Sequence, residues 1–216
     1  MLVIIDYKVG NILNAYNFFK DLDKDIKISS DKEEIMAADI VVLPGVGAFE
    51  DAMISLKNTG LDKVIKSLAK ENKTIIGICL GMQVLFDKSY ENGEFEGLGL
   101  LKGEFIKFNF KDSTIKVPHM GWNILKNNSI GSVNELSNSN SLLTNDLEDK
   151  YAYFVHSYYL SNYNNEDLLL YANYNVKVPA MVRKNNIIGM QFHPEKSSDT
   201  GKLILNNLKK MLIKKE

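Results

Sequence analysis

The strongest constraint on the fold is an alternation, in the first half of the chain, of short apolar runs with segments of helical periodicity. The apolar runs are 2–5, 40–43 and 74–78. Such runs, rich in β-branched residues, are typical of strands covered on both faces. Helical spacing of apolar residues marks 11–22, 51–56 and 61–69. Together these patterns predict an α/β fold with an open, mainly parallel central sheet flanked by helices.

The second half of the chain has a different pattern, with strands that follow one another and few helices between them. The predicted strands are 104–108, 151–155, 168–172 and 187–191, and we expect some of them to be antiparallel. Residues 127–145 are rich in Asn and Ser and predict surface loops, whereas 199–213 predicts a closing helix. No repeat or boundary is evident, so we expect one domain over 1–216.

Composition excludes several classes of function. The 216 residues carry a formal net charge of −1, which provides no basic surface for nucleic acid or anionic lipid. No apolar run approaches the roughly 20 residues of a membrane-spanning helix, and the first residues lack the basic segment of a signal peptide. A single cysteine excludes an intrachain disulfide and agrees with a reducing compartment. We therefore expect a cytoplasmic protein that binds neither nucleic acid nor membrane.

Gly77-Ile78-Cys79-Leu80-Gly81 lies where a predicted strand meets a predicted helix at 82–86. This is the context of a nucleophile elbow, in which a sharp turn holds the nucleophile in a strained conformation and glycines relieve crowding. The start of a helix also favours thiolate over thiol. An inert buried cysteine is the alternative, but the two flanking glycines favour a nucleophile.

A thiol nucleophile needs a base, and the chain has three histidines. His193 follows the predicted strand 187–191 in the sequence Gln191-Phe192-His193-Pro194-Glu195. Residues two apart in an extended segment point the same way, so Glu195 can orient the His193 ring. An exposed turn is the alternative, and the pairing with Cys79 favours catalysis.

Pro44-Gly45-Val46-Gly47 follows the predicted strand 40–43, at the edge where a parallel sheet binds ligands. Glycines there let backbone N–H groups approach an oxyanion, although the same residues also suit a simple turn. The motif is too short for a dinucleotide fingerprint, and we expect no cofactor. The three histidines and the cysteine lack ligand spacing, so we expect no metal site.

Together, residues 77–83, 44–47 and 191–195 resemble the class I, or triad, glutamine amidotransferases. Within that family the chain is most similar to the glutaminase subunits of imidazole glycerol phosphate synthase. The narrower resemblance depends on Asp6-Tyr7 with Gly10-Asn11, on 117–123 (Val-Pro-His-Met-Gly-Trp-Asn), on 153–158 and on 193–197. It extends from the first predicted strand to the last predicted helix.

The resemblance implies a fold, an activity and a set of site residues. Cys79 would be the nucleophile, His193 the general base and acid, and Glu195 the carboxylate that orients His193. Oxyanion and glutamine binding would involve Gly45, Val46, Gly47, Leu80, Gln83, Glu91 and Ser157. A cyclase partner, a (β/α)8 barrel that consumes the ammonia, would contact His119, Trp122, Tyr153 and Lys196, although these four residues also suit ordinary packing.

Three other functions stay open at this point. The chain departs from the histidine-pathway pattern at Ala48, at 173–179 and at Met190. These departures admit a paralogue that supplies ammonia for amidino sugars of surface polysaccharides or flagellin glycans. A stand-alone γ-glutamyl cysteine hydrolase would use the same elbow and base without a partner. A catalytically silent subunit is disfavoured, because all three triad positions are filled.

Overall fold

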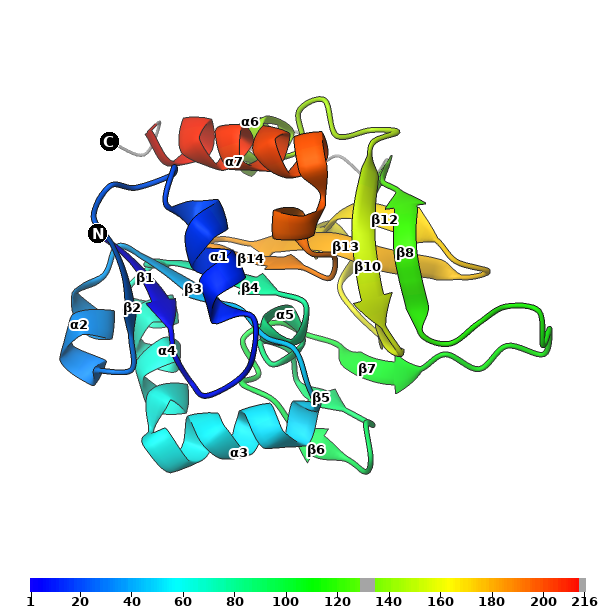
Figure 1. Cartoon of the computed structure of the whole chain (residues 1–216), viewed down its shortest axis with the longest axis horizontal. Coiled ribbons are helices and arrows are strands. Elements are labelled where there is room, and N and C mark those ends of the chain that lie inside the picture. Colours follow the sequence, from blue (N-terminus) through cyan, green and yellow to red (C-terminus); the bar gives the residue numbers. More distant parts are fainter. Residues whose placement is uncertain (129–134, 214–216) are drawn as a thin grey trace.

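The computed structural model describes residues 1–128 and 135–213 (Figure 1). The main sheet of this described part has eight strands. Their order across the sheet is β2 (Ile26–Ser29), β1 (Leu2–Ile5), β3 (Ile40–Leu43), β4 (Thr74–Ile78), β14 (Ile187–Met190), β13 (Lys177–Lys184), β12 (Leu168–Asn173) and β9 (Lys126–Asn127).

The first five strands in this order are parallel, and the last three are antiparallel to their neighbours. The predicted mainly parallel sheet with antiparallel strands in the C-terminal half is therefore confirmed. Strand β14 comes from the end of the chain but pairs in parallel with β4, where Met190 lies opposite Ile78. The chain segments that follow β4 and β14 consequently leave the sheet side by side.

Two smaller sheets lie beside the main one. Strand β8 (His119–Ile124) pairs antiparallel with β10 (Tyr151–His156). A four-stranded sheet has the order β11 (Tyr158–Ser161), β7 (Glu104–Lys107), β5 (Lys88–Ser89) and β6 (Phe95–Glu96). The β8–β10 pair stands next to the end of β14, as Figure 1 shows, and thus close to the segment after that strand.

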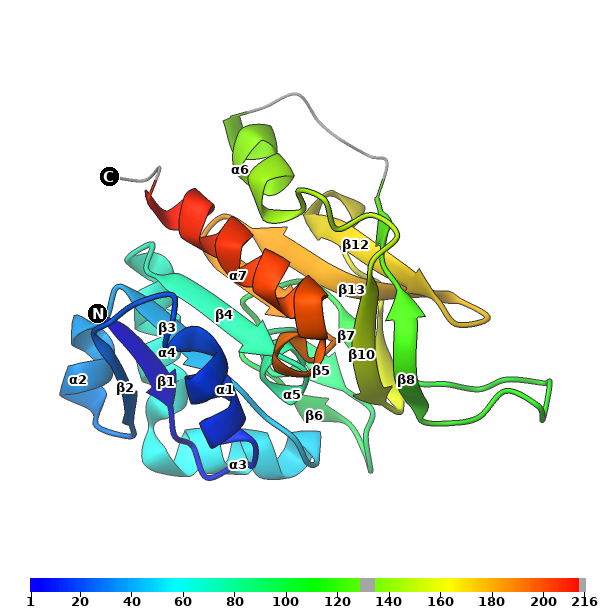
Figure 2. The same cartoon turned by 45° about the horizontal axis from the view of Figure 1, so that its top comes forward.

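Helices cover both faces of the main sheet (Figures 1 and 2). One face carries α1 (Ile12–Phe19), α6 (Glu135–Leu143) and α7 (Ser198–Ile213). The other face carries α2 (Lys32–Ala37), α3 (Phe49–Thr59), α4 (Leu61–Lys70) and the short α5 (Leu80–Gln83). Two 3-10 turns, η1 (Asn165–Asp167) and η2 (Pro194–Lys196), complete the described elements.

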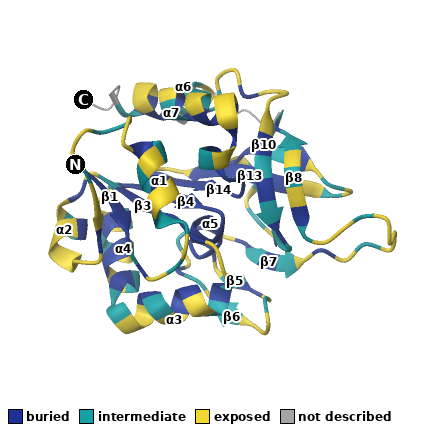
Figure 3. Cartoon of the chain, viewed as in Figure 1, coloured by how far each residue is buried: buried dark blue, intermediate teal, exposed yellow. Residues whose placement is uncertain are grey.

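Strand β1 shows why these apolar runs form a doubly covered sheet. All four of its residues are fully buried; Leu2 and Ile4 pack toward α1 and α7, whereas Val3 and Ile5 pack toward α2, α3 and α4. The central strands are accordingly dark in the burial colouring of Figure 3. None of the helices in residues 1–128 and 135–213 has the length and apolar character needed to cross a membrane.

Several predicted elements need correction. The first helix ends at Phe19 rather than at 22, and the helix after Cys79 is α5, which begins at Leu80 and ends at Gln83. Within the predicted loop 127–145, residues 129–134 lie outside the described part, and 135–143 form α6. Leu143 is fully buried in the same cluster as Ile204 and Leu208 of α7. Tertiary packing therefore overrides the low helix propensity of this Asn- and Ser-rich segment.

Candidate active site

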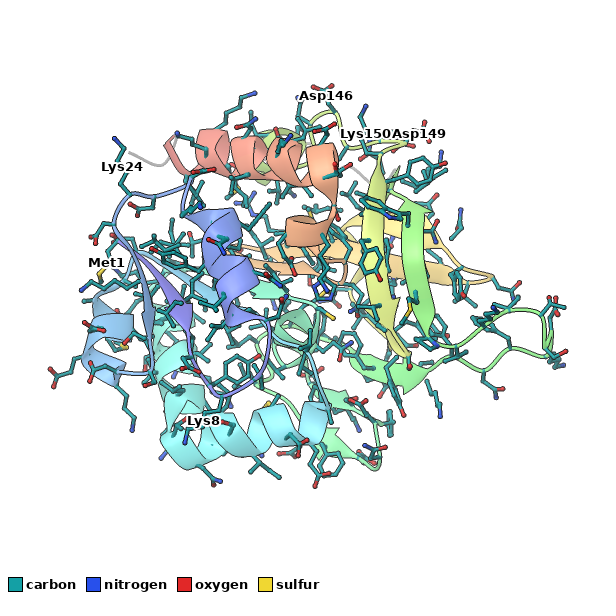
Figure 4. All side chains as sticks on the ribbon, viewed as in Figure 1. Met1, Lys8, Lys24, Asp146, Asp149 and Lys150 are labelled. Atoms are coloured by element: carbon teal, nitrogen blue, oxygen red, sulfur yellow. The ribbon has the colours of Figure 1, made fainter. Side chains whose placement is uncertain are left out.

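The predicted site residues follow strands that end at one edge of the sheet. Strands β1, β3, β4 and β14 are parallel, so the segments that follow them leave the same edge. These segments carry Asn11, the 44–47 turn, Cys79 and the 191–195 run. Figure 4 marks Lys8 at the outer bend of the loop that follows β1. The topology thus brings together residues from both ends of the chain.

Cys79 sits at a sharp bend between β4 and α5. Its φ of 53° and ψ of −111° lie outside the ordinary regions for a residue with a side chain, as the elbow prediction requires. Its backbone N–H donates a 2.7 Å hydrogen bond to the carbonyl of Met190 on the neighbouring strand. Cys79 is 6% exposed, so the bend presents a mostly covered sulfur at the edge of the sheet.

The two glycines around Cys79 are required by space. A Cβ on Gly81 would lie 1.8 Å from the carbonyl oxygen of Leu43, and one on Gly77 would lie 2.5 Å from the carbonyl oxygen of Gly81. No side chain fits at such distances without moving backbone. Gly45 packs against the same bend, because a Cβ there would lie 3.1 Å from Cβ of Leu80. The predicted crowding of the elbow is confirmed.

His193 and Glu195 form a buried pair. Nδ1 of His193 lies 2.7 Å from Oε1 of Glu195, and the two side chains are 0% and 3% exposed. Burial lowers the pKa of His193, but the neighbouring Cys79 sulfur and the hydrogen bond with Glu195 outweigh it and raise this pKa to about 9. Burial raises the pKa of Glu195, but the hydrogen bond and charge of His193 outweigh it and lower that pKa. The pair is therefore built to carry an imidazolium beside a carboxylate.

Two residues without a predicted role complete this polar cluster. Nδ2 of Asn11 donates a 2.6 Å hydrogen bond to Oε1 of Glu195, the oxygen that also binds His193. Nε2 of Gln191 lies 3.7 Å from Sγ of Cys79, and Oε1 of Gln191 accepts a 3.2 Å hydrogen bond from Gln83. The sulfur also lies 3.9 Å from the carbonyl oxygen of Val155. The amide of Gln191 is thus placed to stabilise negative charge on the sulfur.

A cavity of about 310 Å³ opens beside Cys79. Of the seven residues predicted for oxyanion and substrate binding, it is lined by Val46, Gly47, Leu80, Gln83, Glu91 and Ser157. Gly45, the seventh, does not line the cavity but packs against Leu80, which does. Further lining comes from Pro118, Val155, His156 and Tyr158. One oxygen of Glu91 accepts a 2.8 Å hydrogen bond from the backbone N–H of Phe49, which fixes this carboxylate beside the 44–47 turn.

Comparison with known proteins identifies the family. The family model "Glutamine amidotransferase class-I" matches residues 3–211. The chain belongs to the class-I glutamine amidotransferases. It is therefore an enzyme of this class, and its elbow and His-Pro-Glu run are the features that pointed to the family from the sequence.

Individual relatives narrow the assignment to a branch of the amidotransferases. The chain is 46% identical to "Imidazole glycerol phosphate synthase subunit HisH" of Carboxydothermus hydrogenoformans, over 98% of this chain and 100% of that protein. It is 44% identical to the HisH subunit of Bacillus subtilis, over 98% of this chain and 96% of that protein. Identity at this level over nearly the whole length places this amidotransferase in the HisH family.

Solved structures agree on the fold. A structure titled "Crystal structure of glutamine amidotransferase" superposes with a TM-score of 0.70 at 17% identity, covering 95% of this chain and 97% of that one. PurLQS from Thermotoga maritima superposes with a TM-score of 0.67 at 19% identity, covering 96% and 98%. The amidotransferase fold is therefore shared by proteins with little sequence identity to this one.

Three of the four predicted interface residues of this amidotransferase meet on one exposed face. The Trp122 and Tyr153 rings are 6.0 Å apart, and Nζ of Lys196 lies 5.8 Å from the centre of the Tyr153 ring. Trp122 is 52% exposed, whereas His119 is 2% exposed, with its ring hydrogen-bonded inside the fold. A role for these residues in binding the partner stays a prediction. His119 would contribute through its contacts inside the fold rather than by touching the partner.

Sequence reasoning missed several residues that the fold brings to this amidotransferase site. Asn11 and His156 stood in the motifs that carried the resemblance, but nothing in those motifs showed what their side chains contact. Gln191 precedes Phe192-His193 on the same run, and its approach to Cys79 depends on the pairing of β14 with β4. Within the described residues, no group of three His, Cys, Asp or Glu side chains is arranged to bind a metal ion.

Proposed function

We propose that this chain is the glutaminase subunit of imidazole glycerol phosphate synthase, hydrolysing L-glutamine to glutamate and passing ammonia to a cyclase partner in histidine biosynthesis. The observation that carries the proposal is the strained Cys79 beside the buried His193–Glu195 pair, at the wall of a cavity of about 310 Å³. Nucleophile, base and orienting carboxylate are the components of a cysteine triad.

The reaction has two halves. The thiolate of Cys79 attacks the side-chain carbonyl carbon of glutamine, and the resulting tetrahedral oxyanion collapses as the C–N bond breaks. His193 gives a proton to the leaving nitrogen, so ammonia departs and a glutamyl thioester remains. Water then attacks the thioester while His193 accepts its proton; the C–S bond breaks, glutamate is released, and the thiolate of Cys79 is restored beside protonated His193. Glu195 keeps the ring of His193 oriented through both proton transfers.

Backbone N–H groups supply the oxyanion site in this mechanism. Leu80 follows the nucleophile directly at the start of α5, and Val46 and Gly47 line the cavity opposite it. Gly47 has a φ of 125°, which few residues other than glycine adopt. Removing one such donor from an oxyanion site typically costs about 10²–10³ in rate. The turn 44–47 that follows β3 therefore has a catalytic as well as a structural role in the proposal.

The cavity also suits the amino-acid end of glutamine. Glu91 uses one carboxylate oxygen to bind the N–H of Phe49, and its second oxygen remains available for an α-ammonium group. Gln83 and Ser157 provide further polar atoms in the same cavity. A cavity with few polar groups at fixed positions is typical of small-molecule sites. These contacts support L-glutamine as the substrate.

A (β/α)8 cyclase is the proposed partner, and no cofactor is needed for the hydrolysis. The exposed cluster of Trp122, Tyr153 and Lys196 supports a docking surface on β8, β10 and η2, because aromatic residues are enriched at interfaces. We also propose that 1–216 is one amidotransferase domain, since the main sheet takes strands from both halves of the chain. A cytoplasmic location suits a nucleophile that must stay reduced, and cell fractionation tests it.

Glutamate release from glutamine by the purified chain tests the proposal. It is measured for the chain alone and with the histidine-pathway cyclase loaded with its ribonucleotide ligand, and Cys79→Ala is the control. We expect strong stimulation by the loaded cyclase and no activity for Cys79→Ala. A folded cyclase that gives no stimulation would point to the amidino-sugar paralogue. A chain that is already fast alone would point to a stand-alone γ-glutamyl hydrolase.

A further inference from the structure

Two buried histidines, His119 and His156, face one another across the β8–β10 pair and take no part in the triad. They are direct neighbours in the antiparallel register, and they are 2% and 6% exposed. Nδ1 of His119 lies 3.0 Å from Nε2 of His156. Buried polar side chains are costly unless every donor and acceptor is satisfied, so the surroundings of this pair decide what it does.

The direction of each hydrogen bond in this pair can be assigned from its two ends. At one end, Nδ1 of His156 lies 2.8 Å from the carbonyl oxygen of Tyr158, which only accepts. His156 therefore carries its proton on Nδ1 and accepts on Nε2. At the other end, Nδ2 of Asn123 lies 3.1 Å from Nε2 of His119, and an amide nitrogen only donates. His119 consequently carries its proton on Nδ1 and donates it to His156.

The orientation of the Asn123 amide is fixed as well. Its Oδ1 accepts a 2.7 Å hydrogen bond from the backbone N–H of Ile124, and its Nδ2 donates a 3.0 Å hydrogen bond to the carbonyl oxygen of Asn173. The two ends of the chain of hydrogen bonds thus agree on one tautomer for each histidine. Adding a proton to either ring would set two donors against each other.

Aromatic rings also hold His119 in place. Its ring stacks on Phe154 at 4.6 Å and on Tyr174 at 4.0 Å between centroids, so both of its faces are covered. Both ring nitrogens are bonded in the ring plane. A ring that is fixed by stacking and by hydrogen bonds together is a rigid support.

The far end of this chain of hydrogen bonds is the wall of the substrate cavity. His156 and Tyr158 line that cavity together with Val155 and Ser157. The carbonyl of Val155 lies 3.9 Å from Sγ of Cys79, so the same segment also borders the nucleophile. The bond from His156 to the carbonyl of Tyr158 spans Ser157, which is thereby held between two fixed points.

We propose that His119 and His156 are positioning residues that tie the 155–158 wall of the glutamine cavity to strand β8, and so set the affinity for glutamine. The inference rests on the proposed glutaminase function, which it deepens. His119 acts through His156, and neither ring takes part in the proton transfers of the triad. Loss of the bond to Tyr158 frees Ser157 and the carbonyl of Val155 to shift, which weakens glutamine binding more than it slows the chemical steps.

Matched substitutions separate positioning from simple packing. In His156→Asn, the amide nitrogen occupies nearly the place of Nδ1 and can still donate to the carbonyl of Tyr158. In His156→Gln, the amide reaches the place of Nε2 instead, so it bonds to His119 and leaves that carbonyl without its donor. His119→Phe keeps the stacking but removes both hydrogen bonds. Tyr174→Phe keeps the stacked ring and loses only a 2.8 Å bond to the carbonyl of Lys116, so it is the control.

The test measures KM and kcat for glutamine with each variant in complex with the loaded cyclase, and unfolding curves of each chain verify folding. We expect KM to rise about tenfold or more in His156→Gln and His119→Phe, with smaller changes in kcat. His156→Asn raises KM less than His156→Gln does, and Tyr174→Phe leaves it near the wild-type value. Equal KM values for the Asn and Gln variants, or a fall in kcat alone, would overturn the inference.

Nitrogen-15 NMR of the histidine side chains in the same complex gives an independent readout. The inference expects both His119 and His156 in the form protonated on Nδ1, and a form protonated on Nε2 at either ring would overturn it. If the wild-type complex releases no glutamate, the proposed function fails, and this inference fails with it. If the wild-type complex is active but His156→Gln keeps the wild-type KM, only the positioning inference fails.

Discussion

The side-chain amide of Asn11 donates a 2.6 Å hydrogen bond to the carboxylate of Glu195, although the two residues lie 184 positions apart in the chain. The same oxygen accepts the 2.7 Å bond from His193. Asn11 therefore orients the carboxylate that orients the proposed base. Its φ of 77° and its place at the start of α1 aim the amide toward η2.

Replacing Asn11 by glycine tests this arrangement without straining the backbone, because glycine tolerates a positive φ. A hydrogen bond to a charged group contributes about 1.5–3 kcal/mol, so we expect Asn11→Gly to lower kcat by about 10- to 100-fold. Asn14→Ala removes only the bond from Asn14 to Oδ1 of Asn11, and its effect is smaller. Steady-state kinetics of the loaded complex distinguish the two, and equal rates for Asn11→Gly and wild type would contradict the role of Asn11.

The raised pKa of His193 gives a prediction with a definite sign. Burial alone would lower this pKa, and the neighbouring Cys79 sulfur and the hydrogen bond with Glu195 raise it to about 9. Glu195→Gln and Cys79→Ala each remove one of these partners, so both lower the pKa of His193 in an NMR titration. An unfolded histidine titrates near 6.5, so the stabilisation from His193 is complete below that pH and is lost as pH rises through about 9. An unchanged pKa of His193 in both variants would refute the inference that Cys79 and Glu195 raise it.

Gln191 should control the reactivity of the sulfur. Gln191→Met keeps the side-chain size but removes the amide group 3.7 Å from Sγ. We expect slower alkylation of Cys79 by iodoacetamide at neutral pH, because the thiolate loses a hydrogen-bond donor. The chain has a single cysteine, so mass spectrometry of the alkylated protein reports on this sulfur alone. Gln83→Met keeps the amide of Gln191 but removes the 3.2 Å bond donated to its Oε1, so we expect a smaller decrease in rate; equal rates for both variants would refute the prediction.

Gly81→Ala should destabilise the protein and disturb the elbow. The new Cβ would lie 1.8 Å from the carbonyl of Leu43, so β3 or the bend at Cys79 must move. Overpacking of this kind typically costs about 1–3 kcal/mol of unfolding free energy. Gly10→Ala is the control, because its new Cβ would lie 2.9 Å from Cγ2 of Val46, and this 38% exposed side chain can move aside whereas the backbone of Leu43 cannot. Urea unfolding compares them, and equal losses would mean that the clash is absorbed elsewhere.

The two non-catalytic histidines predict a loss of stability in mild acid. Burial lowers the pKa of His119 to about 4, and burial together with the charge of His119 lowers that of His156 to about 3. The unfolded chain therefore binds more protons than the folded one between those values and about 6.5. In that window the unfolding free energy decreases as the pH is lowered. Each unit of pKa difference corresponds to about 1.4 kcal/mol. His119→Asn should flatten this dependence in urea titrations at pH 7, 5.5 and 4.5, and parallel curves would contradict it.

Much of the fold follows from local sequence because its central strands are buried on both faces. Runs such as 2–5 and 40–43 are continuously apolar, and a sheet covered by helices on both faces buries nearly all of their residues. Strand β2 escaped prediction because its residues are Ile-Lys-Ile-Ser at an edge of the sheet, with two of them exposed. Strand β13 escaped because Pro179 interrupts its pattern; the partner strand shifts register near that point.

The candidate site also has one part that local sequence predicted and another part that it did not. The elbow and the His-Pro-Glu run are local arrangements, in which neighbours along the chain set the conformation of the functional residue. The contacts of Asn11, Gln191 and the two buried histidines join segments that are far apart in sequence. Their partners depend on strand order and register, which the sequence pattern alone left undetermined. Side-chain chemistry was therefore predicted more completely than side-chain pairing.

The insertion of β14 between β4 and β13 sets the order in which the enzyme can become active during its synthesis. The ribosome releases Cys79 long before residues 187–195, so a growing chain holds its nucleophile without a base. Until β14 arrives, the apolar strand β4 also has one unpaired edge, which favours association with other chains. Completion of the sheet thus covers that edge and brings His193 and Glu195 to Cys79 together, so an unfinished chain has no triad base with which to hydrolyse glutamine.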